Sequence, residues 1–143
     1  GGDDPDCRKP MVWDDLVYEP ETYRSVADFS ESDSVRFDHE LYAYYQKVFA
    51  LRRAHPALRA GSMQTLHRDD EHGVIAFRRE LGKEVVLAVF NVGAREVTFN
   101  LPIEGEGHEW REYLSDRTEQ LRDHQLAIAI EGRTAQIWVR SAR

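Results

Sequence analysis

The chain has 143 residues, of which 41% are hydrophobic and 31% charged, so it can bury a core but is too short for a closed (β/α)₈ barrel, which needs roughly 200 residues. Its net charge of −7 argues against nucleic acid and anionic membranes as partners. No apolar run approaches the ~20 residues of a membrane span, and the single cysteine, Cys7, excludes an internal disulfide and favours a reducing compartment such as the cytoplasm.

Residues 1–36 are predicted to be irregular. They are rich in Asp, Ser and Pro and show little sustained periodicity. An irregular stretch of this length is uncommon in a small free-standing domain. We therefore interpret it as a long functional loop of a larger protein.

One helix is predicted over residues 38–55. Asp38 suits the N-cap, and Phe37 and Tyr42 have the spacing of a hydrophobic staple. The sequence His55-Pro56 ends the helix, because a residue before proline disfavours helical backbone angles.

Apolar side chains cover about half of the circumference of this helix, more than the ~100° stripe of a one-sided surface helix. We expect one stripe to pack on the residues from Gly61 onward and the other to need a partner outside this sequence. An uncovered stripe also predicts self-association through the helix. The first stripe is Phe37, Leu41, Tyr44, Val48 and Leu51, and the second is Tyr42, Tyr45 and Phe49.

Residues 61–143 are predicted to form an antiparallel β-sandwich. The apolar run from Val85 to Phe90 is typical of a central strand, and Val97, Phe99 and Leu101 alternate with polar neighbours as in a strand with one buried face. Turn signals recur about every ten residues. The expected strands are 63–67, 74–80, 84–91, 95–101, 108–114, 119–122, 125–130 and 134–140.

The acidic loop of residues 2–14 is the candidate site. In one interpretation its Asp side chains only satisfy turn N–H groups and Trp13 only packs. In the other, Asp4 and Arg8 offer charged hydrogen-bonding groups to a polyhydroxylated ligand. Composition and spacing alone favour the first.

The loop resembles a known family. The string D-D-P-D-C-R-K-P-M-V-W-D, residues 3–14, is similar to the loop after the eighth barrel strand in the α-amylase family, glycoside hydrolase family 13. It is most similar to the branch of cyclomaltodextrinases, neopullulanases and maltogenic amylases. The string L-R-R-A-H-P-A-L-R, residues 51–59, resembles the end of the last barrel helix of these enzymes.

The resemblance implies a fold and a function for the parent protein. Residues 1–60 would be the tail of a catalytic barrel, and residues 61–143 a C-terminal β-sandwich domain. The parent would be a retaining hydrolase or transglycosylase of α-1,4-glucans, maltooligosaccharides or cyclodextrins, using two carboxylates about 5–5.5 Å apart. The family's catalytic motifs are absent from this sequence, so no catalytic residue is assigned and the chain alone is expected to be inactive.

For this chain the resemblance implies that Asp4 and Arg8 bind donor-side glucose units. It favours a structural anchor at Trp13 over stacking of its ring on a sugar face. No cofactor is expected, and no metal site, because the six histidines lack ligand spacing. The expected partners are the glucan, reached through the missing catalytic barrel, and a second copy of the helix. The alternatives are a stand-alone carbohydrate-binding module, which needs two exposed aromatics on one face, and a purely structural β-sandwich module. A surface sugar-stacking role for Trp110 or Trp138 is disfavoured, because both lie in predicted strands.

Overall fold

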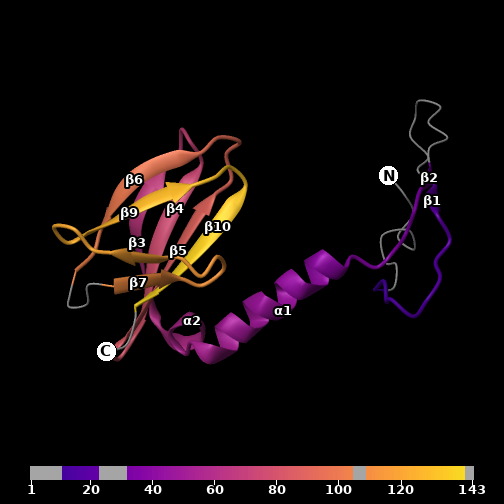
Figure 1. The fold of residues 1–143 in the computed structure, drawn as a ribbon, viewed down its shortest axis with the longest axis horizontal. Coiled ribbons are helices and arrows are strands. Elements are labelled where there is room, and N and C mark those ends of the chain that lie inside the picture. Colours follow the sequence, from indigo (N-terminus) through magenta and orange to yellow (C-terminus); the bar gives the residue numbers. More distant parts are fainter. Residues whose placement is uncertain (1–10, 23–31, 105–108, 141–143) are drawn as a thin grey trace. The chain divides into compact units, whose positions relative to one another are not determined.

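The structure is a computed structural model that describes residues 11–22, 32–104 and 109–140 (Figure 1). The chain forms two compact units, residues 1–45 and 46–143. In the first unit two short strands, β1 (Glu21–Thr22) and β2 (Ser32–Asp33), pair antiparallel. The prediction of irregular structure was therefore wrong at these two places, because a two-residue strand is too short to produce a readable alternation.

Helix α1 (His39–Ala54) confirms the predicted helix within one residue at each end. The Leu41 N–H donates to Asp38 Oδ1 at 2.9 Å, which is the expected N-cap. The rings of Phe37 and Tyr42 lie 5.2 Å apart, as the staple requires. None of the helices in the described ranges combines the length and hydrophobicity that crossing a membrane requires.

A single further turn of helix, α2 (Ala57–Ala60), was not predicted. It begins after Pro56, whose φ of −53° suits the start of a helix. It ends at Gly61, where a Cβ would lie 2.5 Å from the Ala57 carbonyl oxygen. Glycine is needed here for that close approach of backbone to backbone.

The second unit contains an antiparallel sandwich, as predicted. Its larger sheet has the order β3-β4-β5-β10-β7-β8, and its smaller sheet is the pair β6-β9. All eight expected strands are present, and Figure 1 shows the smaller sheet as a separate layer. The strands are β3 (Ser62–Asp69), β4 (Val74–Leu81), β5 (Glu84–Asn91), β6 (Val97–Pro102), β7 (Glu109–Glu112), β8 (Thr118–Gln120), β9 (Gln125–Ile130) and β10 (Thr134–Arg140).

The core lies between the two sheets. Strand β5 is central in the larger sheet, between β4 and β10, which explains its unbroken apolar run. Strand β9 of the smaller sheet buries every second residue in this core. Trp110 and Trp138 both belong to the core, with 1% and 0% of their surface exposed, which leaves neither available to stack on a sugar.

Candidate functional site

Asp4 and Arg8, the two predicted sugar-binding residues, lie outside the described residues, as does Cys7. The described part of the candidate loop begins at Met11. Trp13 lies within it and has 48% of its surface exposed.

Tyr18 closes the loop of residues 11–18 into a compact turn. The Trp13 N–H donates to the Tyr18 hydroxyl oxygen at 2.9 Å, and that hydroxyl donates to the Met11 carbonyl oxygen at 3.0 Å. The Leu16 N–H donates to the Trp13 carbonyl oxygen at 3.3 Å. The backbone of Trp13 is therefore a structural anchor, whereas its indole ring remains accessible.

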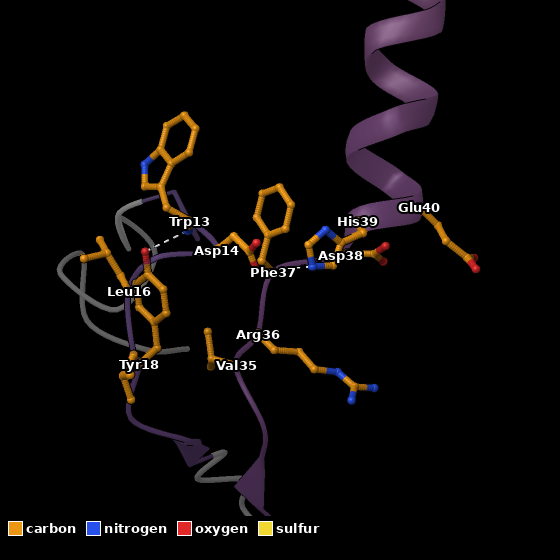
Figure 2. Close-up of a pocket in the computed structure, with 11 residues that line it drawn as sticks. Trp13, Asp14, Leu16, Tyr18, Val35, Arg36, Phe37, Asp38, His39 and Glu40 are labelled. Atoms are coloured by element: carbon orange, nitrogen blue, oxygen red, sulfur yellow. Dashed lines mark hydrogen bonds and ion pairs between the residues drawn. The ribbon is translucent and has the colours of Figure 1, made fainter.

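A pocket of about 830 Å³ lies between this loop and the start of α1. Figure 2 shows Trp13 and Leu16 on one side and Arg36 and Glu40 on the other. Aromatic rings and charged groups therefore line one open pocket. The lining residues are Trp13, Asp14, Leu16, Val17, Tyr18, Val35, Arg36, Phe37, Asp38, His39 and Glu40.

Two of the three carboxylates of this pocket already have partners. Asp14 Oδ1 lies 3.2 Å from His39 Nε2, and Asp38 caps α1. Both ends of the Asp14–His39 contact are about two-thirds exposed, so solvent weakens it. Across the described ranges no group of three or more His, Cys, Asp or Glu side chains is placed to hold a metal ion.

A second aromatic feature, on the larger sheet, was not predicted from the sequence. The rings of Phe77 on β4 and Phe90 on β5 stack at 5.8 Å with an angle of 21° between their planes. The register pairs Ile75 with Phe90 and Phe77 with Ala88, which puts all four on one face of the larger sheet. Both Phe rings are half-buried. Only the strand register reveals this pair, because thirteen positions separate the two residues in the sequence.

The sandwich and the helix before it define a class of protein, the C-terminal domain of α-amylase-type enzymes. The family described as "Maltogenic Amylase, C-terminal domain" matches residues 63–135, just over half of the chain. The chain belongs to this family, within the enzymes of glycoside hydrolase family 13.

Individual relatives agree with this assignment. The chain is 35% identical over 91 residues to a cyclomaltodextrinase of Bacillus sp, covering 64% of this chain and 13% of that protein. It is 26% identical over 131 residues to neopullulanase 2 of Thermoactinomyces vulgaris, covering 91% of this chain and 19% of that protein. The structure of an Anoxybacillus α-amylase matches with a TM-score of 0.69 and 28% identity, over 82% of this chain and 26% of that one. The chain thus spans less than a fifth of the length of these two curated relatives.

Proposed function

We propose that this chain is the C-terminal segment of an α-1,4-glucan-acting glycoside hydrolase or transglycosylase, and that its role is structural. Residues 1–60 complete the catalytic barrel, and residues 61–143 form the C-terminal sandwich, which supports the last barrel helix near its C-terminal end. The catalytic carboxylates lie on the upstream polypeptide.

The apolar surface of α1 is the observation that carries this proposal. Leu51 is the one buried residue of the helix, with 3% exposed. Leu41, Tyr42 and Tyr44 are 53%, 46% and 48% exposed. Burying one such side chain stabilises a protein by roughly 1.5–3 kcal/mol, so a helix of this composition is suited to a partner along most of its length.

The face of the larger sheet that carries the Phe77–Phe90 stack supports the same proposal. Val86 and Ala88 on this face are buried although they lie outside the core between the sheets. Helix α2 packs against β4 and β5. Ile75 is still 37% exposed, and the two Phe rings are half-buried. An additional layer of protein over this face would complete its burial.

Asp4 and Arg8 would give the segment its contact with sugar. A guanidinium presents a planar fork of donors, and a carboxylate accepts from hydroxyl groups, so the pair can orient one glucose unit. The expected substrates are maltooligosaccharides and cyclodextrins, bound by the parent barrel.

A chimera tests the proposal. This chain replaces the matching C-terminal segment of the Bacillus cyclomaltodextrinase, and a second version of that enzyme lacks the segment. We expect cyclodextrin hydrolysis in the chimera and none in the truncated enzyme. Asp4→Ala or Arg8→Ala in the chimera should lower kcat/KM about tenfold or more, the cost of one charged hydrogen bond. The control Arg122→Ala, at an exposed arginine of the sandwich outside the candidate pocket, should not. Equal activity of all variants would rule out sugar binding by the pair.

A stand-alone carbohydrate-binding module is the second candidate function. The observations in its favour are the exposed indole of Trp13 in the pocket and the Phe77–Phe90 pair. Calorimetric titration of the 143-residue chain with β-cyclodextrin and maltoheptaose distinguishes the two functions. Saturable binding that Trp13→Ala or Phe77→Ala abolishes would favour the module, and the absence of binding would favour the structural role.

A further inference from the structure

The C-terminal end of α1 is tied to the sandwich by Glu84, at the start of β5. Glu84 Oε1 lies 2.8 Å from His55 Nδ1, and Oε2 accepts the Ala57 N–H at 2.6 Å. Both side chains of the Glu84–His55 pair are mostly buried, with 27% and 18% exposed. This carboxylate therefore holds the point where α1 ends and α2 begins.

A second carboxylate, Glu112 at the end of β7, is 2% exposed and fully hydrogen-bonded. Its Oε1 accepts the N–H groups of Ile137 at 2.8 Å and Leu114 at 3.1 Å. Its Oε2 accepts the N–H and the hydroxyl of Ser115, both at 2.6 Å. Burial acts to raise the pKa of Glu112, but these four hydrogen bonds together outweigh it and hold the pKa below its ordinary value. Glu112 is thus an ionised group around which the turn of residues 113–115 is built.

That turn makes one contact with the middle of α1 and one with the residue that follows the helix. Lys47 Nζ donates to the Leu114 carbonyl oxygen. The Tyr113 ring meets the His55 ring edge-on, with 5.9 Å between centroids. Neither contact involves Glu112 directly. Glu112 accepts the N–H of Leu114 and so holds the residue that Lys47 contacts, whereas the N–H of Tyr113 donates to the Ile137 carbonyl oxygen at 2.7 Å.

Lys47, Leu51 and His55 follow one another at intervals of four residues, so they share one face of the helix. Eight residues correspond to about 12 Å along a helix axis. Lys47 and His55 are therefore two anchors separated by two turns, with the buried Leu51 between them. One anchor would leave the helix free to pivot, whereas two fix its direction on the sandwich.

We propose that Glu112 is a positioning residue that, through the turn 113–115, fixes the direction of residues 46–54 of α1 on the sandwich. The biological role of this fixed helix rests on the proposed function, because a sandwich can support a barrel only through a helix whose direction is fixed. The contacts that fix the helix lie entirely within residues 46–143.

Residual dipolar couplings of the weakly aligned 143-residue chain test the proposal. In the wild type we expect the amides of residues 46–54 and those of β4, β5 and β10 to fit one alignment tensor. In Glu112→Gln the couplings of the helix should shrink relative to those of the strands. Amide exchange in the same helical residues should become about tenfold faster or more than in β5, the factor for loss of one charged hydrogen bond.

Lys47→Met is the second variant, because it removes the ammonium group but leaves the sheet and its core untouched. It should reduce the helix couplings in the same way. Glu109→Gln is the matched control, since this exposed carboxylate lies on the same strand and contacts Gln120 at 3.0 Å. Its helix couplings should equal those of the wild type.

Unchanged helix couplings in a folded Glu112→Gln variant would overturn the proposal. Unchanged couplings in Lys47→Met would also do so, even where Glu112→Gln does not fold. Reduced helix couplings in the Glu109→Gln control would show that loss of any carboxylate charge on β7 loosens the helix. That result would also overturn the proposal. These measurements use neither sugar nor barrel, so their outcome is independent of the chimera experiment.

Discussion

The side-chain amide of Asn91 on β5 donates to the carbonyl oxygen of Ile130 on β9 at 3.2 Å, and so joins the two sheets of the sandwich. The same Nδ2 donates to the Arg95 carbonyl oxygen at 2.8 Å, and Oδ1 accepts the Gly93 N–H at 2.9 Å. Asn91 is 1% exposed. One buried amide therefore fastens the segment by which the chain crosses from the larger sheet to the smaller one.

Replacing Asn91 with alanine should lower the free energy of unfolding by about 1–3 kcal/mol, because buried backbone groups lose their partner. Urea denaturation of the 143-residue chain measures this loss. Asn100→Ala is the matched control, since Asn100 is exposed on β6 and its replacement should change stability by no more than about 0.5 kcal/mol. Equal stabilities of the two variants would contradict this role of Asn91.

The crossing segment also predicts a strict requirement for glycine at position 93. A Cβ there would lie 2.3 Å from the His72 carbonyl oxygen, which is backbone and cannot move aside easily. Gly93→Ala should cost about 1–3 kcal/mol by overpacking. Gly82→Ala is the comparison, because Gly82 has a φ of 60° but open space around its Cβ, and it should cost only about 1 kcal/mol. A Gly93→Ala variant as stable as the wild type in urea would contradict the prediction.

The sequence predicted those parts of the fold whose signals are local. The N-cap at Asp38, the proline stop at Pro56 and the alternation along β9 each act over a few residues, so their elements were predicted within one or two positions. The roles of Asn91 and Glu112 could not be predicted in this way. Each side chain bonds to backbone groups brought to it by the tertiary fold, and Asn91 and Ile130 are 39 positions apart.

The candidate site was predictable only in part. Only the resemblance to a family points to Asp4 and Arg8, and sugar binding by these two residues remains a prediction. The pocket beside Trp13 was not predicted, because its walls come from two segments, residues 13–18 and 35–40, whose proximity depends on the chain between them. The Phe77–Phe90 pair was missed because it requires the register of β4 on β5.

Substitutions in the turn between β8 and β9 should raise the stability of the sandwich. Asp123 and His124 have φ values of 50° and 59°, and Arg122 and Gln125 exchange backbone hydrogen bonds at 3.0 and 2.8 Å. A two-residue turn with both φ values positive favours Asn-Gly. The double variant Asp123→Asn, His124→Gly should gain about 1 kcal/mol and raise Tm by about 4 °C.

Thermal unfolding followed by circular dichroism checks the gain at this turn. Gln125→Gly is the control, because Gln125 is the first residue of β9 and glycine weakens a strand. Its Tm should fall. A fall in Tm for the double variant as well would contradict the prediction. It would show that the side chains of Asp123 and His124 stabilise the fold by more than their backbone strain destabilises it.

Self-association through α1 is a further expectation. Leu41, Tyr42 and Tyr44 expose about half of their surface, and exposed apolar patches mark interaction sites. Sedimentation velocity over a range of concentrations should show a dimer or higher oligomer of the 143-residue chain. The triple variant Leu41→Ser, Tyr42→Ser, Tyr44→Ser should shift it to a monomer. A wild type that remains monomeric at the highest concentration would contradict this expectation.

Glu112 should make the stability of the sandwich dependent on pH. Its hydrogen bonds hold its pKa in the folded state below the ordinary value of 4.5. The unfolded chain therefore binds the proton more readily, and stability falls as the pH falls. The full contribution of Glu112 to the free energy of unfolding is present at pH values above the ordinary pKa of the unfolded chain. It is lost as the pH falls from there through the lower pKa of the folded state. Urea midpoints measured between about pH 6 and pH 3 should thus drop more steeply for the wild type than for Glu112→Gln, which has no carboxylate to protonate. Glu109→Gln should keep the steep wild-type profile, and parallel profiles for all three proteins would show that Glu112 does not bind its proton differently on folding.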